Sequence, residues 1–492
     1  MTLNSSIYKI GKDQFNELLD QGYNQIPIIK NLGQLNNNFF QLYKSLPFKE
    51  KIILESRGES KDEHFSFIGF DSFHKVSCTH ENLNDYNKFT SKYEMKILEN
   101  YLNNWKSPKH IFDCKFPFLS GAMGFISYEA HSLFEKTPII HEQGLEIPYY
   151  FFYFVDKVFI YDHSSGNLFS SCSGSDFDLL QERSSDLNNL YKNFSKNSYT
   201  DEPIRPTFSS LNQGSFKSNF TREQYIDAVN DVKSYIAKGE TYQANISQRF
   251  ETPFQGVPSD VYQTLININP VNYAGYVETD DFVLACVSPE RLIQLKNNNL
   301  LSRPIAGTRR RGKNLHEDTK FYRELQEDAK EQAEHSMLVD LIRNDIGRVS
   351  EYGSVKIKKL AEITNYRHVM HLESEITGQI SPSVNLNQIL KATFPGGTIT
   401  GVPKIRTIEI IAEVEKKPRG FYTGSLGYID FSGDFDFNII IRSIIFQNKK
   451  AYFHVGGGVT YDCNPDSEYK ETLNKAFSQF SALNAHNGKH IL

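Results

Sequence analysis

The sequence predicts a mixed α/β protein, because strand-forming stretches alternate with stretches of helical period along most of its 492 residues. The clearest strand signal is residues 149–161, YYFFYFVDKVFIY, where aromatic and β-branched residues predominate. The clearest helix begins at Thr221, which forms a capping box with Gln224, and the Lys-Gly pair at 238–239 ends it. The stretch before that helix is rich in Ser, Asn, Pro and Lys and has no period. We therefore expect an N-terminal region at 1–195, a linker at 196–219 and a C-terminal region at 220–485.

Within the N-terminal region, residues 51–56 (KIILES) and 64–70 (HFSFIGF) are strand-like and flank a polar turn, which predicts a hairpin-like pair. In residues 117–129 (PFLSGAMGFISYE), Gly121 and Gly124 lie within an apolar run. Glycines at such positions indicate close approach of another backbone in a strand.

Composition and charge narrow the class of protein. Hydrophobic residues make up 39% of the chain and charged residues 23%, as in globular proteins. The net charge of -5 provides no basic field for nucleic acid and no polybasic membrane anchor. The first residues, MTLNSSIYKIGKDQF, lack a secretory h-region, and no run of 18 apolar residues occurs, so we expect a cytoplasmic protein without a membrane span. Five scattered cysteines without a C-x-x-C pair argue against a zinc cluster.

Two stretches place carboxylates along one helix face. We expect a single helix over 320–345, on which four glutamates spaced 3, 4 and 3 fall within an arc of about 80°. These glutamates are Glu324, Glu327, Glu331 and Glu334. The last helix begins at Asn464-Pro465 and carries Glu468, Glu471 and Lys475. Each stripe is either a solvated acidic face or one half of a site for a hard divalent cation.

Three further segments carry side chains suited to chemistry. Glu290 follows Ser288-Pro289 at a strand end, where a carboxylate is either a base or an exposed turn residue. Residues 303–312, RPIAGTRRRG, offer backbone N–H groups and a hydroxyl at Gly-Thr, and their three consecutive arginines either steer an anion or balance the acidic helix that follows. Residues 394–404, FPGGTITGVPK, precede a helix expected near Pro403 and favour a carboxylate or phosphate, although the Walker A pattern is absent.

Isolated residues add weaker signals. His371 lies in an apolar strand, where a histidine is usually part of the core, and the glycine triplet at 456–458 allows a backbone or ligand to approach closely. Together with Arg442, the two acidic stripes and the glycine-rich loops indicate Mg²⁺ bridging to an acidic small molecule.

Four motifs carry a resemblance to a known family. They are PIAGTRRRG (304–312), EHSMLVDLIRNDIGRVSEYGSV (334–355), FPGGTITGVPKIRTIEII (394–411) and EYKETLNKA (468–476). In this order they resemble the chorismate-utilising enzymes, specifically component I of aminodeoxychorismate synthase and of anthranilate synthase. The resemblance implies a large α/β sandwich of two antiparallel sheets with helices outside. It also implies Mg²⁺-dependent amination of chorismate, with ammonia supplied by a separate glutamine amidotransferase subunit.

The resemblance assigns roles residue by residue. Glu334 and Glu471 match magnesium ligands, and Glu331 and Glu468 match carboxylates that hold the metal's waters. Glu290 matches the acid/base near the C4 hydroxyl of chorismate. The remaining matched positions are His371 near the leaving group and the substrate-holding residues Ala306, Gly307, Thr308, Thr398, Tyr422, Arg442, Gly456, Gly457 and Lys475.

Gln243 indicates the nucleophile. Water-using relatives carry a basic lysine at the matching position, whereas an amide has no useful basicity, so we expect ammonia as the nucleophile. Ala306 is typical of anthranilate synthases, whereas FPGGTITG and NPVNYAGY (269–276) favour aminodeoxychorismate synthase. We expect the latter, with anthranilate synthase as the alternative and a non-catalytic chorismate- or tryptophan-binding subunit as a remote one. The residues that resemble a tryptophan pocket are Leu54, Glu55, Ser56, Asn272 and Tyr273.

Overall fold

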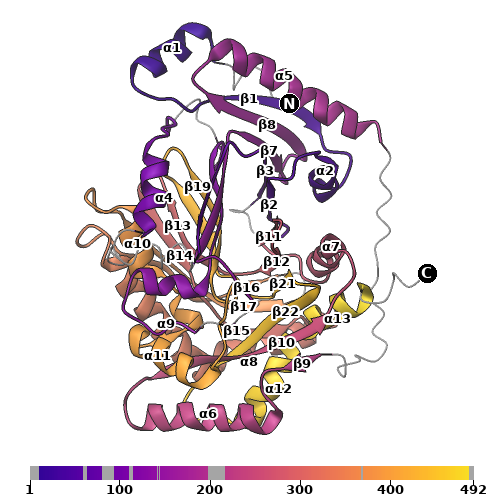
Figure 1. Ribbon diagram of the computed structural model, residues 1–492. Helices are drawn as coiled ribbons and strands as arrows, with labels where there is room; N and C mark the ends of the chain where they lie inside the picture. Colours follow the sequence, from indigo (N-terminus) through magenta and orange to yellow (C-terminus); the bar gives the residue numbers. More distant parts are fainter. Residues whose placement is uncertain are drawn as a thin grey trace.

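Two large antiparallel β-sheets with helices outside them form the protein, which confirms the predicted fold class (Figure 1). The computed structural model describes residues 10–58, 64–79, 94–109, 115–140, 142, 145–197, 216–366 and 369–486. Each sheet combines strands from both sides of the expected linker, whose residues 198–215 lie outside the described ranges. No helix in the described ranges is long and apolar enough to cross a membrane.

The first sheet has 12 strands among the described residues. In spatial order they are β1 (Ile26–Gln34), β8 (Asn167–Gly174), β7 (Lys157–Asp162), β3 (Phe65–Phe70), β2 (Lys51–Glu55), β11 (Tyr273–Glu278), β12 (Val283–Ser288), β21 (Ser443–Gln447), β22 (Lys450–Val459), β10 (Gln243–Pro253) and β18 (Gly401–Val402), with β9 (Lys217–Ser218) also paired to β10. The expected pair at 51–56 and 64–70 is present as the antiparallel neighbours β2 and β3.

The second sheet has 10 strands in the same described ranges. Their order is β15 (Ile305–Arg310), β17 (Val369–Gln379), β14 (Asn299–Arg303), β13 (Arg291–Lys296), β20 (Phe435–Asn438), β19 (Ser425–Asp430), β5 (Gly121–Ile126), β6 (Tyr150–Val155) and β4 (His74–Cys78), with β16 (Lys356–Asn365) also paired to β17. Gly121 and Gly124 allow close backbone approach as predicted, since a Cβ on Gly124 would lie 1.9 Å from the carbonyl oxygen of Phe151.

Aromatic and aliphatic side chains pack between the sheets. Phe67 of the first sheet and Tyr428 of the second meet edge to face, with ring centroids 5.6 Å apart. The β-prone stretch 149–161 contributes to both sheets, because the chain crosses between them at Asp156 and continues from β6 into β7. Val155 and Val158, on either side of that crossing, are both fully buried.

The helices lie outside the sheets. They are α1 (Lys12–Asp20), α2 (Phe39–Ser45), α4 (Glu94–Asn103), η2 (Tyr128–Leu133), α5 (Phe177–Ser195), α6 (Arg222–Ala237), α7 (Pro258–Ile268), α8 (Leu315–Glu327), α9 (Ala329–Gly347), α10 (Leu386–Thr393), η4 (Gly397–Ile399), α11 (Lys404–Glu415), α12 (Pro465–Lys475) and α13 (Phe477–His486). Figure 1 shows α1 and α5 beside β1, with α6, α11 and α12 at the opposite end of the molecule. The capping box at Thr221 and the start of the last acidic helix at Asn464-Pro465 are confirmed.

The expected single helix over 320–345 is wrong, because Asp328 divides it into α8 and α9. Asp328 is extended, and its side chain accepts hydrogen bonds from the backbone N–H groups of Lys330 and Glu331. An N-cap of this kind satisfies donors that a continuous helix would have bonded itself. Consequently only Glu331 and Glu334 of the four spaced glutamates belong to α9.

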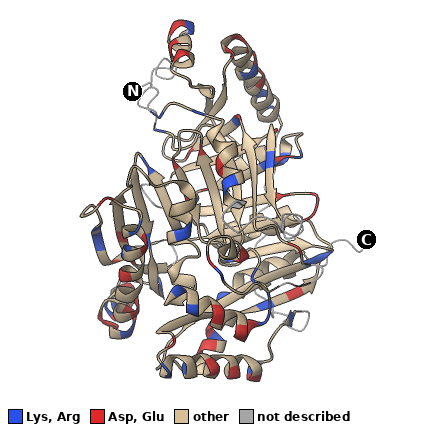
Figure 2. Cartoon of the chain, turned by 60° about the vertical axis from the view of Figure 1, so that its left-hand side comes forward, with Lys and Arg blue, Asp and Glu red and all other residues tan. Residues whose placement is uncertain are grey.

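The three consecutive arginines balance acidic residues, and their segment is strand β15 and its exit rather than a loop. Arg310 pairs with Glu317 at 2.8 Å and Arg311 with Asp318 at 2.6 Å, both on α8. Arg309 bridges Asp328 and Glu331. Figure 2 shows acidic and basic residues interspersed along the outer helices, with few on the strands between them. The alternative that these arginines steer an anion therefore loses its support.

Candidate active site

Two chain crossings between the sheets bring the predicted acid and the predicted carboxylate binder together. The chain leaves the first sheet after β12, turns at Pro289-Glu290 and enters the second sheet as β13, and it returns at 439–442 between β20 and β21. These crossings hydrogen-bond to each other, since Ile439 N donates to Glu290 O at 3.0 Å and Val287 N to Arg442 O at 3.4 Å. Glu290 and Arg442, 152 positions apart in the numbering, therefore lie in adjacent turns.

Glu290 has the environment of a general acid. Its side chain is only 6% exposed, and Thr398 Oγ1 of η4 donates to its Oε1 at 2.8 Å. Burial raises the pKa of Glu290 to about 7, against the opposing effects of the Thr398 hydrogen bond and the Arg442 charge. At neutral pH a large fraction of this carboxyl group therefore retains its proton. A cavity of about 20 Å³ lies against Glu290, Gly397 and Thr398.

Arg442 is a partly buried cation available to a ligand. Burial lowers the pKa of its guanidinium, and the nearby Glu290 carboxylate partly offsets that effect. Among the described residues no carboxylate forms a salt bridge with Arg442, whereas Arg291, which follows Glu290, binds both oxygens of Asp436. A partly buried guanidinium that has no anionic partner among the described residues is suited to a substrate carboxylate.

Thr308 and His371 face each other across β15 and β17. Their Oγ1 and Nδ1 atoms are 2.9 Å apart, and the two residues pair in register. The register shifts between Ala306 and Thr308, where Gly307 has φ +59°, so the strand bulges at the glycine. Burial, followed by the charge of Arg442, lowers the pKa of His371 to about 4, so its ring is neutral at pH 7.

The acidic faces of α9 and α12 interact across the site. Burial raises the pKa of Glu334, and the negative charges of Glu331 and Glu471 raise it further. Burial also raises the pKa of Glu468 to about 7, with Glu471 and Glu334 contributing in the same direction. Carboxylates on two helices far apart in sequence therefore influence each other's pKa, although burial is the larger cause in both cases.

Each acidic helix lies over a predicted substrate-binding glycine. A Cβ on Gly307 would lie 3.0 Å from Glu331 Oε2, and a Cβ on Gly457 would lie 3.0 Å from Glu468 Oε2. Glycine at both positions leaves room between strand and carboxylate. Glu331 therefore lies against Gly307, and Glu468 against Gly457.

Two lysines compensate part of this negative charge. Lys330 lies 3.7 Å from Glu334, and Lys475 lies 2.7 Å from Glu471 while its ammonium also donates to Gly456 O at 3.1 Å. The Glu471 and Lys475 side chains are 50% and 47% exposed, which places them where the site opens to solvent. Across the described ranges, no three His, Cys, Asp or Glu side chains are arranged closely enough to hold a metal ion.

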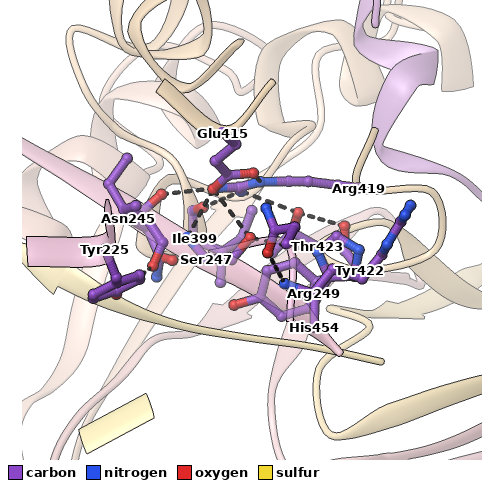
Figure 3. Close-up of polar contacts among 12 residues, drawn as sticks. Tyr225, Asn245, Ser247, Arg249, Ile399, Glu415, Arg419, Tyr422, Thr423 and His454 are labelled. Atoms are coloured by element: carbon purple, nitrogen blue, oxygen red, sulfur yellow. Dashed lines mark hydrogen bonds and ion pairs between the residues drawn. The ribbon is translucent and has the colours of Figure 1, made fainter. Parts of the chain in front are cut away.

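Arg419, a residue that the sequence interpretation missed, connects several parts of the site (Figure 3). It is 1% exposed and forms an ion pair with Glu415 at 2.7 Å. Its guanidinium also donates to the backbone carbonyls of Asn245 at 2.6 Å and Ile399 at 3.0 Å, and lies 5.6 Å from the Tyr422 ring. It thereby joins β10, the η4 turn beside Thr398 and the segment of Tyr422. The sequence did offer one signal for this residue, because Arg419 is a charged residue within the apolar segment PRGFYTG (418–424).

A second, larger cavity lies between the sheets. Its volume is about 590 Å³, and all five residues that resemble a tryptophan pocket line it: Leu54, Glu55, Ser56, Asn272 and Tyr273. Glu55 accepts hydrogen bonds from Tyr262 and Arg57, whereas no donor among the described residues reaches the buried side-chain oxygen of Asn272. The structure thus brings these residues from β2 and the start of β11 to one cavity.

Comparisons with known proteins identify the family that this chain resembles. Residues 49–481 match the family model of the chorismate binding enzymes. Aminodeoxychorismate synthase component 1 of Bacillus subtilis (strain 168) is 41% identical over 372 residues, covering 75% of this chain and 78% of that protein. Anthranilate synthase component 1 of Lactococcus lactis subsp. lactis (strain IL1403) is 35% identical over 438 residues, covering 88% and 95%.

Solved structures show the same likeness. Anthranilate synthase component I from Streptococcus pneumoniae TIGR4 superimposes with a TM-score of 0.72 at 31% identity, covering 90% of this chain and 97% of that one. MenF, the menaquinone-specific isochorismate synthase from Escherichia coli, has a TM-score of 0.66 at 16% identity, covering 95% and 98%. Because the identity to MenF is only 16%, this similarity concerns the fold alone.

Proposed function

The chain belongs to the family of chorismate binding enzymes, and from this premise we propose that it aminates chorismate with ammonia to give 4-amino-4-deoxychorismate. The observation that carries this branch is the 41% identity to an aminodeoxychorismate synthase component 1, against 35% for an anthranilate synthase component 1. The segment FPGGTITG, whose Thr398 contacts Glu290, supports the same branch.

The chain's own residues divide the chemical work. Arg442 binds a substrate carboxylate, and Tyr422, Lys475 and the backbone of Gly457 hold the remaining acidic groups. Glu290 gives its proton to the 4-hydroxyl as the C–O bond breaks, which yields water. The lone pair of ammonia forms the new C–N bond, and the nitrogen then loses a proton. Neutral His371, fixed by Thr308, lies beside the leaving group without adding a positive charge.

The carboxylates of α9 and α12 suit Mg²⁺. They provide oxygen ligands from two helices. Burial raises the pKa of Glu334 and Glu468, neighbouring carboxylates raise it further, and a divalent cation would offset both effects. Glu334 and Glu471 would hold the ion, with Glu331 and Glu468 binding its waters. When bound, Mg²⁺ neutralises the ring carboxylate of chorismate and assists departure of the hydroxyl.

Ammonia requires a source outside this chain. The named relatives are component 1 proteins, which supports a separate component that supplies ammonia from glutamine. Four of the five cysteines lie in the described ranges, and all four are buried. A glutaminase nucleophile must be accessible to its substrate, so these cysteines are unsuitable for that role. We propose a glutamine amidotransferase subunit as that partner and the cytoplasm as the place of the reaction.

Anthranilate synthesis is the second candidate, and two observations favour it. Ala306 stands where many aminodeoxychorismate synthases carry a lysine nucleophile, and the 590 Å³ cavity is lined by the residues that resemble a tryptophan pocket. In that reaction ammonia enters at C2 and pyruvate is expelled.

Product identification distinguishes the two reactions. The purified protein is incubated with chorismate, Mg²⁺ and an ammonium salt, and the product is analysed by chromatography and fluorescence. We expect a product that becomes 4-aminobenzoate only after a separate lyase is added. Immediate release of fluorescent anthranilate and pyruvate would establish the second candidate instead, and the absence of any aminated product would overturn both.

A further inference from the structure

Arg419 uses every hydrogen-bond donor of its guanidinium inside the protein (Figure 3). Nε and Nη2 donate to the two oxygens of Glu415 at 3.0 and 2.7 Å, and Nη2 also donates to Asn245 O at 2.6 Å. Nη1 donates to Ile399 O at 3.0 Å and to Thr423 Oγ1 at 3.2 Å. These contacts account for all the N–H groups of an arginine. Since Arg419 is also only 1% exposed, it can influence a reaction only through other residues.

The contact with Ile399 supports a turn whose own backbone hydrogen bonds are long. Within η4 they measure 3.3 Å from Ile399 N to Gly396 O and 3.4 Å from Thr400 N to Gly397 O. Short 3-10 turns have poorer hydrogen-bond geometry than α-helices. The bond from Arg419 to Ile399 O is shorter than either and has a charged donor, which strengthens it. The guanidinium therefore helps to fix η4 from outside the turn.

Thr398, which directly precedes Ile399, connects this turn to the proposed acid. Its Oγ1 donates to Glu290 Oε1 at 2.8 Å. Burial raises the pKa of Glu290 to about 7, and the Thr398 hydrogen bond lowers it from a still higher value, as do the backbone N–H of Ile305 and the charge of Arg442. The position of η4 therefore affects how readily Glu290 holds its proton.

The other charged side chains beside the proposed acid have partners of their own. Arg291 and Asp345 line the same small cavity. Arg291 pairs with Asp436 at 2.8 Å, and Asp345 of α9 pairs with Lys404 at 2.8 Å. Among the groups that set the pKa of the acid, the Thr398 hydroxyl is the one that η4 carries.

We propose that Arg419 is a positioning residue of the amination reaction, which holds η4 so that Thr398 keeps its hydrogen bond to Glu290. This inference rests on the proposed function, in which Glu290 gives up the proton. Without the guanidinium, Ile399 O loses its donor, η4 shifts and the Thr398 bond lengthens. A longer bond stabilises the carboxylate less, so the pKa of Glu290 rises further. An arginine that only stabilised the fold would leave this pKa unchanged in a folded variant.

Arg419→Lys tests the link in the full chain. Lysine keeps the positive charge beside Glu415 but lacks the planar fork that reaches Glu415 and Ile399 together. The readout is the midpoint of the decline of kcat with pH, measured for chorismate consumption with ammonium at saturating Mg²⁺ and constant free ammonia. We expect this midpoint to move to higher pH by about half a pH unit to one pH unit, the effect of losing one neutral hydrogen bond.

Thr398→Val shows whether the effect passes through the turn. It removes the hydroxyl itself and should move the midpoint in the same direction and by a similar amount. Combined with Arg419→Lys, it should move the midpoint no further, because both changes remove the same hydrogen bond to Glu290. Independent effects would instead add.

Arg249→Lys is the matched control. Arg249 lies on β10, is 5% exposed and pairs with Glu142 at 3.0 Å, so its replacement also perturbs a buried ion pair. The midpoint should stay where it is in the unmodified protein. Should Arg419→Lys fail to fold, Arg419→Gln combined with Glu415→Gln removes both charges of the pair at once. No buried charge is then left uncompensated, and the same upward movement is expected.

The outcomes separate this inference from the proposed function. An unmoved midpoint in a folded Arg419 variant or in Thr398→Val, or additive movements in their combination, would overturn the positioning role. Failure of the unmodified protein to consume chorismate would overturn the proposed function itself. In that case the pH dependence of urea stability still reports the pKa of Glu290 in the same variants, and the same upward movement is required there.

Discussion

Replacing Glu290 with glutamine tests the proposed proton donor most directly. Glutamine has nearly the same shape, and its amide oxygen can still accept the hydrogen bond from Thr398, which is 2.8 Å long in the unmodified protein. It cannot donate the proton that the leaving hydroxyl requires. We expect kcat to fall by about 10²- to 10⁴-fold, the usual contribution of a general acid.

The pH dependence gives a second, independent signature. With a pKa of about 7 for Glu290, the protonated fraction falls from about 0.9 at pH 6 to about 0.1 at pH 8. The kcat of the unmodified enzyme should therefore decrease about tenfold over this range, and that of Glu290→Gln should not. The pH dependence of kcat is measured from initial rates of chorismate consumption. Mg²⁺ is kept saturating and the concentration of free ammonia is held constant at each pH. A glutamine variant within tenfold of the original rate, with the same pH profile, would refute the reasoning.

The same substitution should stabilise the fold above neutral pH. Glu290 has a pKa of about 7 in the folded state against an ordinary value of 4.5, so its contribution to stability is fully present below pH 4.5 and is lost as the pH rises through 7. That difference corresponds to a free energy on the order of 3 kcal/mol. At pH 8 the glutamine variant should exceed the original in urea stability by up to this amount, and at pH 4 the two should agree. Equal stability at both pH values would mean that Glu290 ionises normally.

Further substitutions test the rest of the site. Glu334→Gln and Glu471→Gln should each abolish turnover with Mg²⁺ and ammonium, and near-normal rates in both would remove the proposed metal site. Arg442→Gln should raise the KM for chorismate about 10- to 100-fold through loss of a charge-assisted bond, whereas an unchanged value would place the carboxylate elsewhere. Gln243→Lys should admit water as nucleophile and yield isochorismate, detectable by chromatography. Arg419→Met should lower the free energy of unfolding in urea by about 3–5 kcal/mol because it leaves a buried charge uncompensated, and a loss below 1 kcal/mol would contradict that role.

Local signals in the sequence predicted local structure well. The capping box at Thr221 and the Asn464-Pro465 helix start were readable because the hydrogen bonds that define them span three or four residues. The break at Asp328 had a comparable signal, an aspartate followed three residues later by Glu331, but the helical spacing of the surrounding glutamates obscured it. The three arginines pair with nearby acids, and this outcome was one of two alternatives that spacing alone left open.

The sequence by itself determined the family, the sheet-and-helix class and the residue types of the site, because these depend on short motifs and on patterns within single elements. The tertiary structure decided which distant residues meet. Glu290 and Arg442 become neighbours through two crossings between sheets, and Arg419 reaches β10 and the η4 turn only once α11 has packed. Burial then sets the chemistry, since the same glutamate that ionises near pH 4.5 in water retains its proton to about pH 7 between the sheets. Neither adjacency nor desolvation is encoded in any one segment of the chain.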